Sequence, residues 1–205
     1  MSKVLIVGNG ESPPASFLRA HFDQADWCIA ADGGYDILRA VGIRPDVVTG
    51  DLDSLTSHVE DGVRLVMNPD QETNDLEKAL QLALDEGARH AVVIGATGLK
   101  LDHTLKNLSV LLQFHSKFES ICFDDERCRM IILEKETELS LKIGTDISLY
   151  PISGKVEGIV THGLKYSLND EFLENGVRDG SSNEVVSNPV RIQYKRGYLL
   201  AIIHH

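Results

Sequence analysis

The sequence has few cysteines and lacks any long hydrophobic run. Its three cysteines, Cys28, Cys122 and Cys128, are an odd number at spacings that form no recognisable pattern, which argues against a disulfide framework. We therefore expect a reduced, cytoplasmic setting. No apolar stretch approaches the roughly 20 residues of a membrane-spanning helix, and we expect no signal peptide because the N-terminal run is too short and too polar.

Positive charge is also scarce. The 205 residues include 20 Lys and Arg against 31 Asp and Glu, so the formal net charge is −11. A general nucleic-acid binder needs a basic face to displace counterions, so this class of protein is not expected. Local binding of anions through a divalent cation stays compatible with such a charge. The length and the 42% apolar content suit one large or two small globular domains.

Several catalytic and nucleotide-binding motifs are missing. There is no G-x-x-x-x-G-K-[ST] loop and no convincing Ser-His-Asp or Cys-His arrangement. Gly8-Asn9-Gly10 follows the first apolar run, but Pro13-Pro14 stand where a dinucleotide-binding turn has its third glycine. What remains is a tight turn whose exposed amides could approach a phosphate.

Apolar runs alternate with amphipathic segments over residues 1–126. This alternation predicts an α/β domain with a Rossmann-like parallel sheet and helices on both faces. The predicted strands cover 3–7, 27–31, 46–49, 63–67, 90–94 and 120–123. The predicted helices cover 14–22, 35–41, 75–86 and 102–114.

The predicted helices have recognisable ends. Asn74 and Glu77 have the spacing of a capping box, and Gly87 ends the same helix. Ser12 is a candidate cap for the first helix. The last helix has leucines on one side, at positions 105, 108, 111 and 112.

The pattern changes after residue 126. Short β-type runs separated by glycine turns predict a small all-β domain over 127–205, either a sandwich or a barrel. The predicted strands cover 129–133, 136–142, 146–151, 157–161, 189–195 and 198–203. The last two are expected to form a hairpin through Arg196-Gly197.

Two carboxylates follow the third predicted strand. Asp51 and Asp53 lie two residues apart, and such residues point the same way in an extended chain. At about 4 Å and an effective dielectric constant near 20, they repel by roughly 4 kcal/mol, a cost that a cation between them removes. Taken alone, the pair is more typical of a solvated turn.

Other polar clusters follow three more of the predicted strands. Loops beyond the carboxyl ends of parallel strands meet at one rim of the sheet, where ligands bind. The four clusters are Asp32-Gly33-Gly34, Gly50 to Ser54, Asp70 to Asp75 and Gly95 to His103. Four clusters on one rim favour a functional site, and Asp residues from separate loops suit Mg²⁺ shared with substrate phosphates.

The order and spacing of these clusters resemble the thiamine pyrophosphokinase family over nearly the whole chain. The matching segments are Asp32-Gly33-Gly34, Gly50-Asp51-Leu52-Asp53-Ser54, Asp70 to Leu80, Gly95-Ala96-Thr97-Gly98, Leu101-Asp102-His103-Thr104-Leu105, Gly163-Leu164-Lys165-Tyr166 and Gly180-Ser181-Ser182-Asn183-Glu184. The resemblance implies an ATP-binding and Mg²⁺-binding α/β catalytic domain, followed by a thiamine-binding and dimer-forming β-sandwich. It implies transfer of pyrophosphate from ATP to the hydroxyethyl group of thiamine, with release of AMP.

The resemblance also implies roles for individual residues. Asp51 and Asp53 would hold Mg²⁺ together with Asp75, and either Asp75 or Asp102 would position or deprotonate the attacking hydroxyl. The residues implied to line the ATP site are Asp32, Gly33, Gly34, Asn74, Gly95, Thr97, Gly98, Lys100 and His103. Ser182 and Asn183 match the motif that faces the thiamine pyrimidine across a homodimer interface. For His103, a purely structural role in the first helical turn stays open.

Three positions depart from the family pattern. Gly98-Leu99-Lys100 stands where the family has Gly-Gly-Arg, and lysine lacks the bidentate fork of arginine. Asn74-Asp75 replaces a Thr-Asp pair, and Glu72 replaces an aspartate. The metal-binding carboxylates implied by the resemblance are all present, so we expect altered kinetics rather than a different reaction.

Two other functions stay open. A pyrophosphokinase for another hydroxymethyl heterocycle, such as a pterin, would share the ATP half, although Lys165-Tyr166 and Ser182-Asn183 favour thiamine. The other is a sensor that binds nucleotide or thiamine without turnover. Binding alone does not require so dense a cluster of carboxylates, which favours an enzyme.

We predict that Asp53→Ala nearly abolishes AMP release and leaves the fold intact, because it removes a carboxylate expected to hold the metal. The measurement is AMP formation from ATP and thiamine, with circular dichroism as the check on folding. Near-normal turnover in this variant would exclude a central role for the Asp51 and Asp53 pair.

Overall fold

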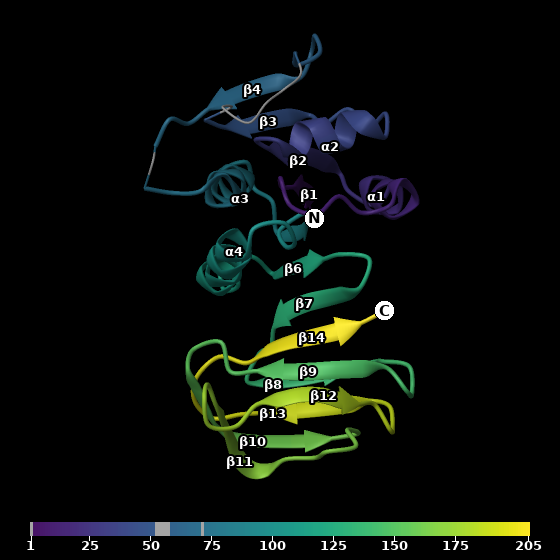
Figure 1. The fold of residues 1–205 in the computed structure, drawn as a ribbon, viewed down its shortest axis with the longest axis vertical. Coiled ribbons are helices and arrows are strands. Elements are labelled where there is room, and N and C mark those ends of the chain that lie inside the picture. Colours follow the sequence, from purple (N-terminus) through teal and green to yellow (C-terminus); the bar gives the residue numbers. More distant parts are fainter. Residues whose placement is uncertain (1, 52–57, 71) are drawn as a thin grey trace. The chain divides into compact units, whose positions relative to one another are not determined.

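The computed structural model describes residues 2–51, 58–70 and 72–205 of the chain. The chain forms two compact units, Met1–Glu126 and Arg127–His205. The first combines helices with strands, whereas every regular element of the second is a strand (Figure 1).

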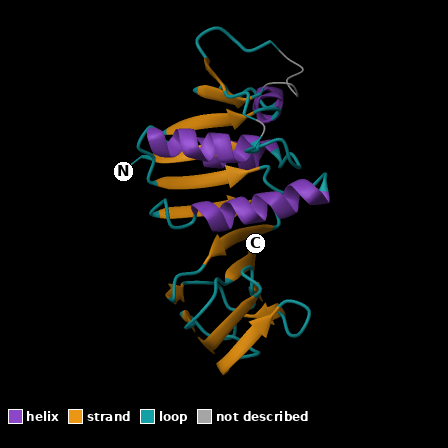
Figure 2. Cartoon of the chain, turned by 90° about the vertical axis from the view of Figure 1, so that its left-hand side faces the viewer, coloured by secondary structure: helices purple, strands orange, loops and turns teal. Residues whose placement is uncertain are grey.

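The first unit contains a parallel sheet with the strand order β6-β5-β1-β2-β3-β4, in which every neighbouring pair is parallel. The strands are β1 (Lys3–Val7), β2 (Trp27–Ala31), β3 (Val47–Gly50), β4 (Arg64–Met67), β5 (His90–Ile94) and β6 (Ser120–Asp124). The helices are α1 (Ala15–Phe22), α2 (Gly34–Ala40), α3 (Asp75–Asp85) and α4 (Leu101–Phe114). In Figure 2, α3 and α4 lie in front of the strands, and in Figure 1 α1 and α2 lie on the opposite side. The predicted α/β fold is confirmed.

The strand order reverses beside β1. The chain proceeds from β1 to β2, β3 and β4 on one side, and then returns to place β5 and β6 on the other. Because all these strands are parallel, their carboxyl ends lie along one edge of the sheet. Crevices for ligands form at such a reversal, outside the carboxyl ends of the strands.

Apolar side chains from the central strands hold the helices on the sheet. On one face, alternate residues of β1 and β2 pack with side chains of α1 and α2 in a core that excludes water: Leu5, Val7, Cys28, Ala30, Leu18, Tyr35 and Leu38. The alternation follows from the two-residue period of a strand. Each fully buried leucine contributes about 2 kcal/mol relative to an exposed one.

The helix ends agree in part with the sequence. The capping box of α3 is confirmed, since the Asn74 side chain accepts from the backbone N–H of Glu77 and the Glu77 side chain accepts from that of Asn74. The expected cap at Ser12 is wrong, because the residue before α1 is Pro14 and makes no side-chain cap. Within the part of the chain that the structure describes, we find no helix long and apolar enough to cross a membrane.

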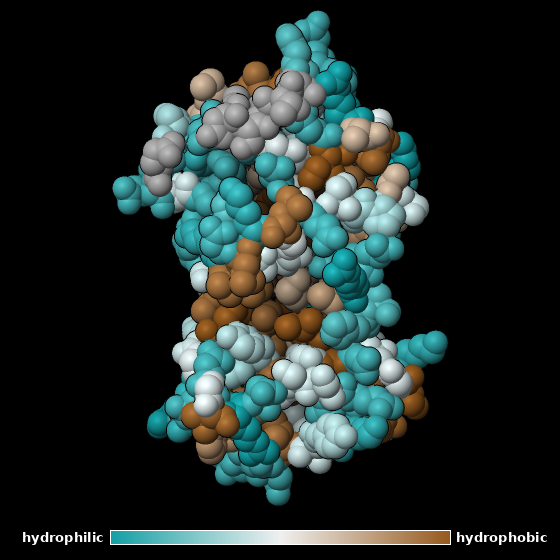
Figure 3. Space-filling view, in the orientation of Figure 1, coloured by the Kyte–Doolittle hydropathy of each residue, from teal (hydrophilic) through white to brown (hydrophobic). Residues whose placement is uncertain are grey.

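The leucine side of α4 is only partly buried. Leu111 has no exposed surface, but Leu105 is 58% exposed and Leu101, at the start of the helix, is 72% exposed. Hydrophobic side chains gather over α4 in the space-filling view (Figure 3). The apolar stripe of this helix therefore extends beyond the part that packs on the sheet.

The second unit is a β-sandwich. Its strands are β7 (Cys128–Ile132), β8 (Glu136–Leu139), β9 (Asp146–Tyr150), β10 (Lys155–His162), β11 (Asn169–Glu174), β12 (Gly180–Glu184), β13 (Val190–Gln193) and β14 (Leu200–His204). They pair antiparallel in the orders β12-β9-β14-β7 and β11-β10-β13-β8. One apolar core takes side chains from both sheets, among them Ile147 and Leu149 of β9 and Val190 and Ile192 of β13. The sandwich is therefore the correct choice between the two predicted β-architectures.

The predicted C-terminal hairpin is wrong. β13 pairs with β8 and β10, whereas β14 pairs with β7 and β9, so the two strands belong to different sheets. The glycine turn at Arg196-Gly197 carries the chain from one sheet to the other, with Gly197 at a φ of +84°. A further difference is that β11 and β12 were absent from the predicted strands.

We predict that Gly34→Ala destabilises the first unit by about 3 kcal/mol, because the new methyl overpacks a backbone contact. A Cβ at this position would lie 2.0 Å from the Val7 carbonyl oxygen. The matched control is Gly87→Ala, where φ is +83° and nothing lies within 4 Å of the added Cβ. This control should cost only about 1 kcal/mol, from backbone strain. Urea unfolding measures both, and equal losses would contradict the packing argument.

Candidate active site

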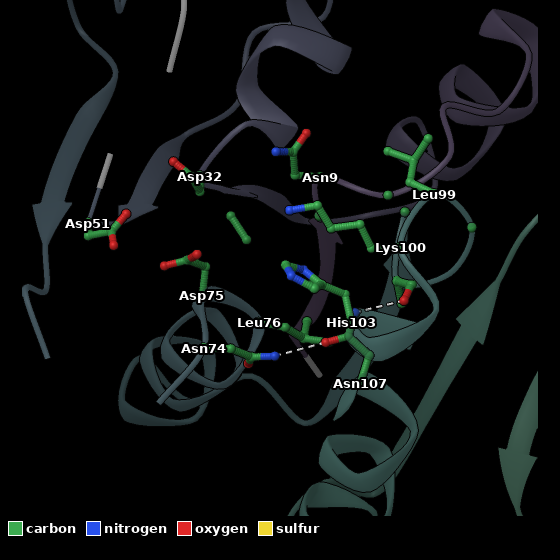
Figure 4. A pocket seen from close by; sticks show the side chains of 16 residues that line it. Asn9, Asp32, Asp51, Asn74, Asp75, Leu76, Leu99, Lys100, His103 and Asn107 are labelled. Atoms are coloured by element: carbon green, nitrogen blue, oxygen red, sulfur yellow. Dashed lines mark hydrogen bonds between the residues drawn. The ribbon is translucent and has the colours of Figure 1, made fainter. Parts of the chain in front are cut away.

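A cavity of about 460 Å³ opens at the carboxyl ends of the parallel strands. Its walls are the loops after β1, β2, β3 and β5 together with the first turns of α3 and α4 (Figure 4). The lining residues are Gly8, Asn9, Gly10, Ala31, Asp32, Asp51, Asn74, Asp75, Leu76, Gly95, Ala96, Gly98, Leu99, Lys100, His103 and Asn107. The cavity lies where the strand order predicts a ligand site.

Three carboxylates converge on one side of this cavity. One oxygen each from Asp32, Asp51 and Asp75 lies within 4.8 Å of the others. The backbone at the end of β3 permits this approach, because a Cβ on Gly50, whose φ is +139°, would lie 3.0 Å from Asp75 Oδ1 and 3.2 Å from Asp32 Cβ. Asp32 itself is buried and has a φ of +48°, a conformation that aspartate tolerates better than most residues.

The donor set of this carboxylate cluster (Asp32, Asp51 and Asp75) fits a hard divalent cation. All its oxygens come from separate loops, and Mg²⁺ prefers such ligands while keeping sites open for water and phosphate. The family resemblance assigned Asp51 and Asp75 to a metal but gave Asp32 only a place near the nucleotide. Asp53, the remaining predicted metal ligand, lies outside the described residues.

Only some of the other residues implied for the ATP site line the cavity. Asn74, Gly95, Gly98, Lys100 and His103 line the cavity, and the side chains of Lys100 and His103 point toward its middle (Figure 4). Three of the described positions implied for the ATP site are not part of the lining: Gly33, Gly34 and Thr97. Asp102, a candidate for the carboxylate that positions or deprotonates the hydroxyl, is not part of it either.

Each of these four positions has another place in the structure. Asp102 lies exposed in the first turn of α4, beside His103. The Thr97 hydroxyl donates to Asp125 Oδ2 at 3.1 Å. Added Cβ atoms on Gly33 and Gly34 would meet the Asn9 side chain and the Val7 carbonyl oxygen. These two glycines allow the loop after β2 to pack tightly against the loop after β1.

The amides of the first glycine turn are already bonded. The N–H groups of Gly8, Gly10 and Glu11 each donate at 2.8 Å to the carbonyls of Ile94, Gly95 and Thr97. A Cβ on Gly10 would lie 2.4 Å from two of these carbonyl oxygens. The expectation that this turn offers exposed amides to a phosphate is therefore wrong for these three groups. Its glycines instead allow two loops to join along one wall of the cavity.

Sequence reasoning missed Asn107, which links three walls of the cavity. Its Oδ1 accepts from the Asn74 side chain at 2.9 Å, and its Nδ2 donates to the Ala96 carbonyl at 2.7 Å. Asn74 at the same time caps α3. A polar residue among the leucines of α4 was the available indication of this role.

Two charged pairs lie beside the cavity on α3. The Lys78 ammonium donates to Asp75 Oδ1 at 3.2 Å, with only 3% of the lysine side chain exposed. Lys106 of α4 pairs with Glu77 at 2.7 Å. Burial acts to raise the pKa of the Glu77 carboxyl, but hydrogen bonds from Lys106 and the Asn74 backbone outweigh it and hold that pKa below its usual range. Glu77 therefore stays ionised and ties α3 to α4.

The predicted acceptor residues lie on β12 of the second unit. Ser182 is exposed and has a φ of +56°, while Asn183 is only 6% exposed. The Asn183 amide accepts from the Tyr166 N–H at 3.0 Å and donates to the Tyr166 carbonyl at 2.8 Å. Asn183 thus fixes the backbone at Tyr166, whose side chain is 64% exposed.

A doubly wound parallel sheet with a carboxylate cluster at its reversal point, followed by a β-sandwich, defines a two-domain α/β protein with a ligand site at the edge of the sheet. Comparison with known families identifies it further. "Thiamin pyrophosphokinase, catalytic domain" matches residues 18–123, and "Thiamin pyrophosphokinase, vitamin B1 binding domain" matches residues 131–199. The chain belongs to the thiamin pyrophosphokinase family, as the resemblance of its motifs predicted, and it is an enzyme of that type.

Individual relatives agree in length and fold. The chain is 27% identical to thiamin pyrophosphokinase 1 of Caenorhabditis elegans, over 98% of this chain and 89% of the relative. It is 25% identical to the thiamine pyrophosphokinase of Bacillus subtilis, with 98% of each chain covered. The crystal structure of a thiamine pyrophosphokinase from Bacillus subtilis superposes with a TM-score of 0.87 at 24% identity, covering 99% of both chains.

We predict that Asn107→Ala lowers the free energy of unfolding by about 2 kcal/mol, because it leaves the Asn74 amide and the Ala96 carbonyl without their partner. The matched control is Ser109→Ala on the same helix, whose exposed hydroxyl donates only to the Leu105 carbonyl. This control should change stability by less than about 0.5 kcal/mol. Urea unfolding followed by the fluorescence of Trp27 measures both. A stability for Asn107→Ala equal to that of the control would contradict the linking role.

Proposed function

We propose that the first unit binds ATP with Mg²⁺ and that the second unit binds thiamine, the acceptor of the pyrophosphate group. The observation that supports this most directly is the convergence of Asp32, Asp51 and Asp75 within 4.8 Å beside a cavity that also contains Lys100. A negatively charged cluster of this kind repels a bare nucleotide and accepts one that brings a cation. Family membership supports the same reaction.

In this proposal the chain contributes position and charge. The three carboxylates of the cluster, with Asp53, would hold Mg²⁺, and the ion would neutralise negative charge on the phosphates. Lys100 offers a further positive charge to them from the opposite wall. The thiamine hydroxyl oxygen attacks the β-phosphorus of ATP in line. The bond between that phosphorus and the oxygen that joins it to the α-phosphorus breaks, and AMP leaves with this oxygen. The hydroxyl proton passes to a carboxylate, Asp75 or Asp102.

The acceptor half of the proposal uses the second unit. Ser182 and the segment held by Asn183 would contact thiamine, and the exposed ring of Tyr166 is suited to stacking on a flat heterocycle. We further propose a cytoplasmic homodimer, in which the thiamine site of one protomer completes the ATP site of its partner. The exposed apolar side of α4 supports an association of this kind.

We predict that the protein, given ATP, Mg²⁺ and thiamine, forms thiamine diphosphate and AMP, and that a chelator stops the reaction. Replacement of thiamine by a hydroxymethylpterin should give no AMP. Chromatography of the products measures both. A pterin diphosphate would favour the other acceptor, and tight ATP binding without AMP would favour a sensor.

Asp51→Asn should lower kcat by about 100-fold or more, because it removes one carboxylate of the cluster. The matched control is Asp70→Asn, since Asp70 lies in another acidic loop near α3 but does not line the cavity. The Asp70 carboxylate accepts from the Thr73 hydroxyl at 2.6 Å. Its replacement should leave kcat within about twofold of the wild-type value.

A further inference from the structure

Lys78 is an unusual residue for its position on α3. Only 3% of its side chain is exposed, whereas lysine is almost never buried unless it is paired. Its ammonium lies 3.2 Å from Asp75 Oδ1, three residues earlier on the same helix. Lys78 therefore places a positive charge next to Asp75, one member of the carboxylate cluster.

Fold stability alone does not explain this lysine. α3 packs on β2 and β3, and most of its other buried side chains near Lys78 are apolar, such as Leu76, Ala79 and Leu80. The charged exception, Glu77, already has a partner in Lys106 of α4. Taking an ammonium out of water is costly, and a buried ion pair that is replaced as a whole by apolar side chains is often no less stable. The neighbouring carboxylate cluster offers a functional reason for a lysine at this position.

The charge of Lys78 lowers the net negative charge that the cluster presents to a cation. Asp32, Asp51 and Asp75 together have three negative charges, and the buried ammonium compensates one of them. Asp75 Oδ1, the oxygen that accepts from Lys78, also faces the space that a side chain on Gly50 would fill. The second oxygen of Asp75 remains for another ligand.

We propose that Lys78 is an internal counter-ion that holds Asp75 until a divalent cation arrives together with ATP. The inference rests on the proposed function of the cavity. A divalent cation alone meets a partly neutralised cluster and a neighbouring positive charge, so it binds weakly. ATP adds phosphate oxygens as ligands and further negative charge, so cation and nucleotide bind together. Lys78 acts through Asp75 and is a positioning residue.

The test compares the wild type with Lys78→Met, which keeps the length of the side chain and removes the charge. The probe is Mn²⁺ without nucleotide, and the signal is the electron paramagnetic resonance of free Mn²⁺. We expect Lys78→Met to bind Mn²⁺ about tenfold more tightly, because the competing charge is gone. Its metal-free melting temperature should fall by about 5 °C, since Asp75 loses its partner. Mn²⁺ should then raise that temperature more than it does in the wild type.

The matched control is Lys106→Met. Lys106 is the partner of Glu77, the residue before Lys78, but it lies outside the carboxylate cluster. It should leave the Mn²⁺ affinity unchanged. In an Asp75→Asn background, Lys78→Met should increase the Mn²⁺ affinity less than it does in the wild type, because the ammonium no longer competes for an Asp75 oxygen. If Lys78→Met does not fold, Lys78→Gln tests the same loss of charge and should show the same tighter binding.

The outcomes separate this inference from the proposed function. Wild-type Mn²⁺ affinity in a folded Lys78→Met or Lys78→Gln variant overturns the counter-ion role, even when the wild type forms AMP from ATP and thiamine. Tighter Mn²⁺ binding in these variants supports the role even if the acceptor is a different heterocycle. A wild type that neither binds Mn²⁺ with ATP nor releases AMP overturns the proposed function and this inference with it.

Discussion

The mutual repulsion of Asp32, Asp51 and Asp75 is the constraint on which the arrangement of the first unit depends. Their oxygens lie within 4.8 Å of one another, and two unit charges about 4 Å apart repel by roughly 4 kcal/mol at an effective dielectric constant of 20. A rigid support must therefore hold the carboxylates together. That support is the parallel sheet, whose central strands are buried and whose carboxyl ends set the starting points of all the loops concerned.

Among the described residues, the turns after β1 and β5 and the start of α3 are linked to one another by hydrogen bonds. Backbone hydrogen bonds join the turn after β1 to the turn after β5, and Asn107 joins the second of these to the cap of α3. Glycines lie where one loop contacts another, because a side chain at these positions would prevent the loops from packing so closely. A site assembled in this way loses little freedom when a substrate binds, which favours both affinity and rate.

The sequence predicted the regular parts of the molecule well. Three strands, β1, β2 and β5, have the predicted bounds, because each is a continuous apolar run between clear turn residues. The capping box of α3 was predicted from two residues at a fixed spacing. Asp51 and Asp75 were predicted to meet because both follow parallel strands in the chain. These successes come from local patterns and from one rule of sheet geometry.

Other features depend on contacts between distant segments and were beyond the sequence. Asn107 and Lys78 look like ordinary surface residues of amphipathic helices, and only the folded structure shows that Lys78 is buried and that Asn107 is half-buried. The family resemblance assigned Asp32 to the nucleotide, and no local pattern in the sequence indicates that its carboxylate meets that of Asp51. The order of β13 and β14 was mistaken because a glycine turn suggests a hairpin, whereas the partners of each strand lie elsewhere in the chain.

The two strands missing from the predicted set, β11 and β12, are the outer strands of the sandwich sheets. They begin with Asn169-Asp170-Glu171 and Gly180-Ser181-Ser182, residues with little preference for extended structure, and both have irregular registers with their neighbours. Exposed sheet edges invite pairing with other chains, and polar residues and bulges discourage it. The irregularity that conceals these strands from a reading of the sequence also protects the protein from aggregation through its sheet edges.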